Sequence, residues 1–252
     1  MTARLLALDL RRGPAPLLAL AMLGLGGALV LGAPGGCDGR WPDAVLALRD
    51  AGWIVFPCVL AAGVWRGGSA RRRQLDDAIT ASPLPAWRRS AIEGGAIAIA
   101  GVATFVVLLA ALTVTGGCTS GLLAGRPAAA ALAGVLALLA AAFTGLALGR
   151  FAVTPMAAPL ALLATLAVTF VAGGWSGGSA DAMLLFPAVG EDVTPRQLTV
   201  RISAGQILWF AGLAVSGWLL ASRFPARFRL TRLVPAAAGL AALAALNPGA
   251  AG

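Results

Sequence analysis

Residues 91–115, AIEGGAIAIAGVATFVVLLAALTVT, form the longest apolar stretch of the chain and contain one charged residue, Glu93. A helix needs roughly 20 apolar residues to cross a bilayer core, so this stretch alone predicts a transmembrane helix. Five further stretches are similarly apolar, and a last one is uncharged but shorter: 17–33, 50–65, 128–149, 151–172 and 202–222, then 233–246. We therefore predict an all-α fold, a polytopic membrane helix bundle with six transmembrane helices in one domain, 1–252, and a seventh if the last stretch crosses.

The composition excludes an ordinary soluble domain and several kinds of active site. Of the 252 residues, 59% are hydrophobic and 12% are charged, which leaves too little polar surface for a soluble fold of this length. The chain contains no Lys, His or Tyr, which excludes a P-loop, a Ser-His-Asp triad and a His-ligated zinc or haem site. We therefore expect no catalytic, cofactor-binding or metal-binding residues, and we do not expect an enzyme.

The distribution of Arg predicts the orientation. With the N-terminus in the cytoplasm, the cytoplasmic segments 1–16, 66–90, 150 and 223–232 contain 14 of the 19 Arg residues, as the positive-inside rule requires. The formal charge of +9 therefore belongs to membrane flanks that face anionic lipids, and we do not expect nucleic acid as a partner. A secretory signal peptide is the competing interpretation of the first stretch, but the stretch is long for one and Pro34 is poorly placed for cleavage.

The predicted cytoplasmic loop 66–90, RGGSARRRQLDDAITASPLPAWRRS, has more pattern than a simple connection needs. Gly67 and Gly68 end the preceding span, and Ser69 can cap a short amphipathic helix over 70–81. One side of this helix offers ion pairs at i, i+4 and the other offers small and apolar residues: Arg72 with Asp76 and Arg73 with Asp77, then Leu75, Ala78, Ile79 and Ser82.

Two prolines, Pro83 and Pro85, stop that helix, and Trp87, Arg88 and Arg89 are the predicted interface anchor of the next span. A plain solvated loop needs only the Arg residues. The capped helix, paired charges and Pro stop favour instead a docking helix for a cytoplasmic partner.

This loop resembles the loop between the second and third helices of permease subunits of type 2 class ABC exporters. The resemblance is carried by a charged run, a short helix, a Ser-Pro pair and a Trp with basic residues: Arg71, Arg72, Arg73, Leu75, Asp76, Asp77, Ser82, Pro83, Leu84, Trp87 and Arg88. The family's Glu and Gly residues and its Leu-rich stretch are replaced here by Gln74-Leu75 and by residues 78–81, AITA. The close match covers the loop, and the six-helix layout extends it loosely over 1–222.

The resemblance implies a function and a set of partners. The chain would be a permease subunit in a bacterial plasma membrane, forming the substrate path with a second copy or a related chain, in contact with membrane lipids. A separate cytoplasmic ATP-binding subunit would receive the coupling helix, whose residues would be Arg71, Arg72, Arg73, Leu75, Asp76, Asp77, Ile79, Ser82 and Pro83. The alternative is a non-transport integral membrane subunit that acts in assembly, as a scaffold or in immunity.

The predicted external face carries further hypotheses. The segment 173–201 contains a short apolar run that could form an interfacial or re-entrant helix, or a loop with a greasy patch. Cys37 and Cys118 both fall outside, where a disulfide could form. Arg49 and Asp50 look like an interface pair at the outer end of the second span.

Within the spans, polar and small residues point to structure rather than chemistry. Glu93 lies near the cytoplasmic headgroups, and we predict that it pairs with the nearby Arg88 and Arg89. Small residues spaced mostly three or four apart predict helix packing inside the bundle: Ala141, Gly145 and Gly149, then Gly94, Ala98 and Gly101, then Gly212 and Ser216. Three prolines could kink spans: Pro57, Pro155 and Pro159.

Overall fold

The computed structural model describes residues 15–32, 45, 48–49, 51–72, 84–115, 125–152, 154–175, 200–222 and 230–246, and the structural statements below concern these residues. They contain helices and no strand, which confirms the predicted all-α class for this part of the chain. The elements in chain order are α2 (Ala15–Gly32), α4 (Gly52–Gly67), α5 (Ser69–Arg72), α7 (Ala86–Thr115), α8 (Gly125–Phe151), α9 (Ala157–Trp175), α11 (Val200–Ala221), the 3-10 helix η2 (Leu230–Leu233) and α12 (Val234–Leu246).

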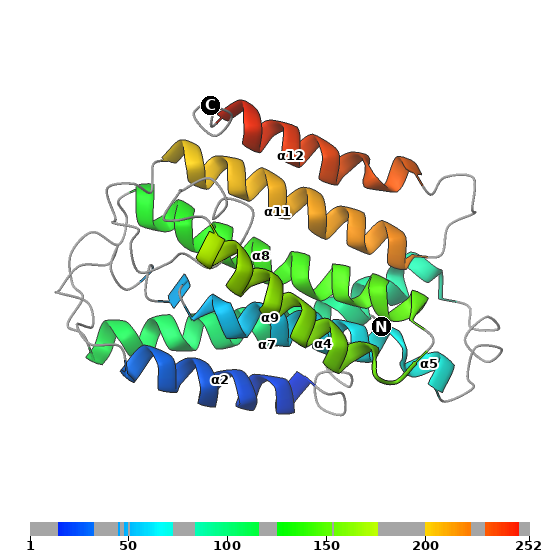
Figure 1. The fold of residues 1–252 in the computed structure, drawn as a ribbon, viewed down its shortest axis with the longest axis horizontal. Helices are drawn as coiled ribbons and strands as arrows, with labels where there is room; N and C mark the ends of the chain where they lie inside the picture. Colours follow the sequence, from blue (N-terminus) through cyan, green and yellow to red (C-terminus); the bar gives the residue numbers. More distant parts are fainter. Residues whose placement is uncertain are drawn as a thin grey trace.

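The long helices lie roughly along one common axis, with α12 and α2 at opposite edges (Figure 1). Helix α8 packs against α4, α7 and α11, while α12 packs against α11 and α9 against α4. Three helices are long and apolar enough to span a membrane, namely Ala86–Val114, Ala128–Phe151 and Ile202–Ala221, and this indicates a membrane protein. The other apolar helices are shorter.

The contact between α4 and α8 is made through glycines of both helices. A Cβ atom at Gly145 would overlap the carbonyl oxygen of Leu60, and one at Gly149 would overlap that of Val64. Two glycines of α4 meet the α8 backbone in the same way: Gly63 at Ala142, and Gly67 at Leu146. Residue numbers rise together along both helices, so α4 and α8 run parallel with their backbones in contact, as small-residue packing allows.

Helix α11 approaches the other side of α8 just as closely. A Cβ atom at Gly217 would lie 2.7 Å from the Thr144 nitrogen, so the two backbones touch there. Toward the start of both helices, Phe210 packs against Ala137 and Ala140, which are fully buried. The alanine-rich sequence of α8 therefore lets two helices pack against it at once, and α8 becomes the centre of the bundle.

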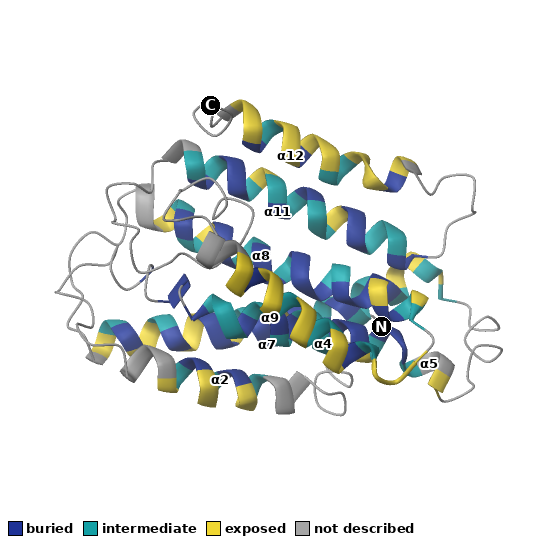
Figure 2. Cartoon of the chain, in the orientation of Figure 1, coloured by how far each residue is buried: buried dark blue, intermediate teal, exposed yellow. Residues whose placement is uncertain are grey.

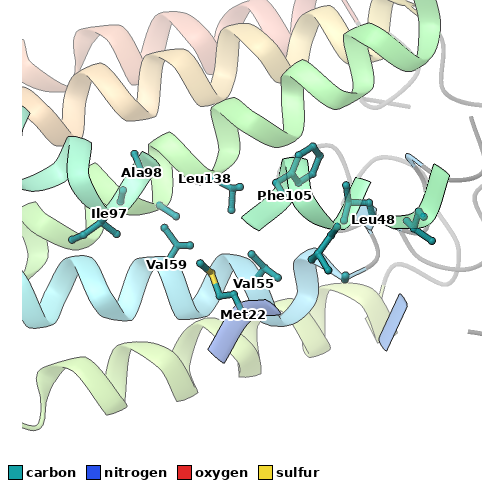
Figure 3. Packing of buried hydrophobic residues seen from close by; sticks show 13 residues of the cluster. Met22, Leu48, Val55, Val59, Ile97, Ala98, Phe105 and Leu138 are labelled. Atoms are coloured by element: carbon teal, nitrogen blue, oxygen red, sulfur yellow. The ribbon is translucent and has the colours of Figure 1, made fainter. Parts of the chain in front are cut away.

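The largest buried cluster lies where α2, α4, α7 and α8 meet, and includes Leu48 ahead of α4. Figure 3 shows its side chains packing between these helices, among them Met22, Leu48, Val55, Val59, Ile97, Ala98, Phe105 and Leu138. In contrast, α9 and α12 carry many exposed residues (Figure 2), and most of the exposed large side chains on them are apolar. Exposed apolar faces at the edges and a packed interior are what a bundle surrounded by lipid tails requires.

Several hydroxyl groups of the described helices donate to their own backbone. Thr104 donates to the carbonyl oxygen of Ala100 at 2.9 Å, and Thr144 donates to that of Ala140 at 2.6 Å. Thr165 and Ser222 make the same bond to the residue four positions earlier. Such bonds allow a polar side chain to sit in an apolar helix without an unpaired hydroxyl.

Two predicted helix starts were wrong. Helix α7 begins at Ala86, directly after Pro85, so Trp87 lies within its first turn rather than in a loop. Helix α9 begins at Ala157 instead of 151, because residues 154–156 form a turn containing Pro155. Pro159 then lies in the first turn of α9, where its missing N–H has no helical partner to lose, so these two prolines do not interrupt the helix.

The predicted small-residue faces pack within the bundle. Gly101 faces Val59 of α4, where a Cβ atom would lie 3.2 Å from its side chain, and Gly94 faces the ring of Phe143. Ala98 is fully buried in the main cluster. The prediction of packing inside the bundle is therefore confirmed for α7, as it is for the α8 glycines.

Helix α12 packs along α11, against the face of α11 that contains the predicted small residues Gly212 and Ser216. A Cβ atom at Gly212 would overlap the carbonyl oxygen of Pro235, and the backbone N–H of Ala236 donates to the Ser216 hydroxyl at 3.0 Å. This bond satisfies an N–H of the first turn of α12, which has no partner inside its own helix. Helix α12 has 13 residues, so its crossing of the membrane stays a prediction.

The glycine contact gives a stability prediction with a matched control. We expect Gly145→Ala to lower the free energy of unfolding by about 1–3 kcal/mol, because the added methyl group forces α4 and α8 apart. Gly95→Ala should change it by less than about 1 kcal/mol, because nothing lies within 4 Å of that Cβ position. Tryptophan fluorescence during unfolding in one detergent measures both, and equal stabilities of the two variants would contradict the packing.

Candidate functional site

The ends of several helices meet at one end of the bundle, which we call the loop end. Helix α4 ends there at Gly67, α7 begins there after Pro85, and α8 and α11 end there, as Figure 1 shows. The described arginine side chains at this end are Arg66, Arg72, Arg88, Arg89, Arg150 and Arg232. The segments that the sequence analysis assigned to one side of the membrane therefore lie together, as far as the structure describes them.

The first part of the predicted coupling loop is a tight continuation of α4. Gly68 forms a turn, and α5 follows over Ser69–Arg72. The Ser69 hydroxyl donates to the carbonyl oxygen of Arg66 at 2.6 Å, so Ser69 satisfies the end of α4 rather than capping the next helix as predicted. Of the predicted coupling residues, the side chain of Arg72 is described and the others lie outside the described side chains: Arg71, Arg73, Leu75, Asp76, Asp77, Ile79, Ser82 and Pro83.

Arg72 folds back onto α4. Its guanidinium lies 4.2 Å from the centre of the Trp65 ring and donates to the carbonyl oxygen of Trp65. Stacking on an aromatic ring and bonding to a helix C-terminal carbonyl both favour a positive charge at this position. Asp76, the predicted partner of Arg72, lies outside the described part of the chain.

The predicted interface anchor is part of the first turn of α7. Trp87 and Arg88 are exposed, and the Arg88 guanidinium lies 4.9 Å from the centre of the Trp87 ring. Arg89 donates to the carbonyl oxygen of Leu84 at 3.2 Å, and this bond ties the residues just ahead of α7 to its first turn. An exposed Trp flanked by basic residues at a helix end is typical of a membrane interface.

Arg150 links α7, α8 and α11 at the loop end. Its guanidinium pairs with Glu93 of α7 at 2.7 Å, donates to the hydroxyl of Ser90 at 2.8 Å and donates to the carbonyl oxygen of Ala221 at the end of α11. Ser90, which is fully buried, also donates to Ala221, at 3.1 Å. The predicted pairing of Glu93 is thus confirmed, but the predicted partners Arg88 and Arg89 were wrong.

A second link joins the same helix ends. The rings of Trp87 and Trp218 lie edge to face at 6.4 Å, and the Trp218 indole N–H donates to the carbonyl oxygen of Trp87 at 3.1 Å. Together with Ser90, Glu93 and Arg150 these residues form what we call the helix-end cluster. It ties the first two turns of α7, which directly follow the 66–85 segment, to the ends of α8 and α11.

The sequence analysis assigned Arg150 to the cytoplasmic side without naming a partner for it, and it did not single out Ser90 or Trp218. Arg150 carried a usable signal, because it is the charged residue between two adjoining apolar stretches and Glu93 is the one charge in its own stretch. Two opposite charges that must both leave the hydrocarbon at the same side are candidates for pairing. Ser90 and Trp218 carried no comparable signal, since their roles depend on which helix ends meet.

Most of the remaining predicted site residues lie outside the part of the chain that the structure describes. Cys37, Cys118 and residues 176–199 lie outside the described residues. Cys58, within α4, is a free cysteine. Among the described residues no group of His, Cys, Asp or Glu is placed to hold a metal ion.

Arg49 was predicted to form an interface pair with Asp50 at the outer end of the second span, and it lies just ahead of α4. Its side chain is 2% exposed, and it donates from Nη2 to Oε1 of Gln206 in α11 at 2.9 Å. The predicted partner, Asp50, lies outside the described residues. Sequence alone could not show that Arg49 contacts α11, because a residue one turn ahead of a span faces either lipid or a neighbouring helix.

Comparison with known proteins identifies no relative. The chain matches no protein-family model, no curated protein and no solved structure.

A double-mutant cycle tests the pairing of Glu93 with Arg150. We expect Glu93→Ala and Arg150→Ala each to lower the free energy of unfolding, and the double variant to lose about 0.5–3 kcal/mol less than their sum, because the two side chains contact each other. Arg150→Ala should lower the free energy of unfolding more than Glu93→Ala does, since Ser90 and Ala221 also lose a hydrogen-bond donor. In the control cycle, Glu93→Ala and Arg88→Ala should be additive, and coupling there instead would favour the originally predicted partner.

Proposed function

We propose that this chain is the permease subunit of an ATP-driven exporter of the type 2 ABC class. In this proposal six helices cross a bacterial plasma membrane with the N-terminus in the cytoplasm, and α12 provides a seventh crossing. The chain pairs with a second copy or a related chain to form the substrate path. A separate cytoplasmic ATP-binding subunit docks on the 66–90 loop and supplies the energy.

The helix-end cluster is the observation that carries this proposal. A loop that couples to an ATPase must pass its displacement to the helices that line the substrate path. The Arg150 bonds and the Trp87–Trp218 contact join the start of α7 to the ends of α8 and α11, which are distant in sequence. A push on the loop would therefore act on three helices together, whereas a purely topogenic loop needs no such link.

The grouping of charges supports the proposed topology. The arginines of α4, α5, α7, α8 and η2 gather at the loop end, and the positive-inside rule assigns such an end to the cytoplasm. Within the described spans, Glu93 and Arg150 are bonded to each other near that end. This arrangement favours an external energy source over a proton or ion relay, which needs ionisable groups along the path.

Association with an ATPase is the direct test. We expect the tagged chain, expressed with its neighbouring genes, to co-purify with a protein that carries a Walker-type nucleotide site. Replacing both Asp76 and Asp77 by Arg should reduce the recovered ATPase at least about tenfold, because charge reversal disrupts the docking helix. The measurement is the molar ratio of the two proteins after purification.

The chain offers a matched control for this charge reversal. Glu191 and Asp192 are also adjacent acids, on the side of the membrane predicted to be external, and replacing both by Arg should leave the ATPase ratio unchanged. Absence of any ATPase from the wild-type preparation would overturn the proposal. It would favour the alternative of an assembly, scaffold or immunity subunit, particularly if other membrane proteins co-purify.

Cysteine accessibility tests the orientation separately. In a chain whose three native cysteines are replaced by Ser, Val114→Cys should react with a membrane-impermeant maleimide on intact cells, because Val114 is 82% exposed at the end opposite the loop end. Pro155→Cys, in the exposed turn between α8 and α9, should react only after the cells are opened. The reverse pattern would place the N-terminus outside.

A further inference from the structure

One side of α7 combines an exposed positive charge with an uncovered apolar surface. Arg88 is exposed at the loop end, and the outward-facing residues of α7 then recur every three or four positions. Nothing lies within 4 Å of the Cβ position of Gly95, so no described residue covers the helix there. We call this surface the α7 stripe, and its members are exposed or half-buried: Arg88, Ile92, Gly95, Ile99, Ala103, Val106, Ala110 and Val114.

The stripe is apolar after Arg88, and its first part has the length of one lipid leaflet. The side chain of Ile99 is 44% exposed, and that of Val106 is 54% exposed. Ile99 lies about 16 Å beyond Arg88 along the helix axis, at about 1.5 Å for each residue. Half of the bilayer core is about 15 Å thick. An acyl chain that lies along the stripe from Arg88 would therefore end near Ile99.

The charge of Arg88 is available to an anion. Its guanidinium stacks on the ring of Trp87, which uses the flat face of the group and leaves the N–H donors at its edge for acceptors. The described part of the chain contains one carboxylate side chain, Glu93, and this is bonded to Arg150. A phosphate group accepts two N–H bonds from one guanidinium, so a phosphate fits Arg88 well.

Two other places in the bundle carry only one of these two features. Arg72 also stacks on a tryptophan, Trp65, but it donates to the carbonyl oxygen of that residue and lies on α5, which packs against α4. Helix α9 has an exposed apolar face, but residues 154–159 at its start contain no arginine. The charge and the apolar stripe come together at α7.

We infer that the α7 stripe binds an anionic phospholipid, with the phosphate at Arg88 and an acyl chain along Ile92, Gly95 and Ile99. An interfacial tryptophan accepts any headgroup. A zwitterionic headgroup brings its own cation, which competes with Arg88 for the phosphate, so a lipid with a net negative charge is preferred. The inference therefore adds a lipid class to the predicted anchor, and it depends on α7 crossing a membrane rather than on transport.

Quenching of a probe on the stripe measures lipid binding at this position. In a chain whose three native cysteines are replaced by Ser, Ile99→Cys is labelled with bimane, and the chain is placed in vesicles of phosphatidylcholine and phosphatidylglycerol. One series has brominated chains on the phosphatidylglycerol and the other has them on the phosphatidylcholine. We expect an affinity about fivefold higher for phosphatidylglycerol, the factor that one arginine at a membrane surface contributes.

Three matched changes separate this site from the general charge of the loop end. Val168→Cys, 52% exposed on α9 at a similar distance from the helix start, should report equal affinities for the two lipids. Arg88→Gln should reduce the preference at Ile99 to less than about twofold, because the phosphate loses its donor. Arg72→Gln removes the same charge from the same end and should leave that preference unchanged.

Three results would overturn the inference. Equal affinities at Ile99 would mean that Arg88 faces water or a protein partner instead of a headgroup. The same preference at Val168 as at Ile99 would mean that anionic lipid gathers around the whole chain, and so would equal losses in Arg88→Gln and Arg72→Gln. The comparison of Ile99 with Val168 needs no arginine variant, so it remains decisive even if Arg88→Gln does not fold.

Discussion

The backbone contact between α4 and α8 is the constraint on which the rest of the structure depends. Gly145 and Gly149 leave no side chain between the helices, and the carbonyl oxygens of Leu60 and Val64 occupy the positions that side chains would need. Contact between backbones fixes both the distance and the register of two helices, whereas contact between long side chains permits several registers. Because α11 also reaches the backbone of α8 at Gly217, three helices are held in one register.

That register determines the chemistry of the loop end. Gly149 packs against Val64, and Arg150 directly follows it. The position of Gly149 therefore fixes where the Arg150 side chain leaves α8. From there it reaches Glu93, Ser90 and the carbonyl oxygen of Ala221. An ion pair whose side chains are 13% and 21% exposed is favourable only when its geometry is good and its other donors are used. The glycine packing supplies that geometry, and the Ser90 and Ala221 bonds use the remaining donors.

Sequence predicted the positions of the apolar helices, but it failed at two helix starts and on the contacts that depend on which helices meet. The apolar stretches predicted each of the long helices that the structure describes, and the small-residue spacing correctly indicated packing inside the bundle. The start of α9 was wrong because an apolar stretch does not reveal that 154–156 turn before Pro159 enters the helix. The partner of Glu93 was wrong because Arg88 and Arg89 are near in sequence, whereas Arg150 is brought near by α8 packing.

Helix α11 connects the two ends of the bundle. At the loop end its Ala221 carbonyl accepts from Arg150, and nearer its start Gln206 accepts from the buried Arg49. A helix of 22 residues moves largely as one body, because each turn is bonded to the next. A shift of the α11 end would therefore change the distance from Gln206 to Arg49.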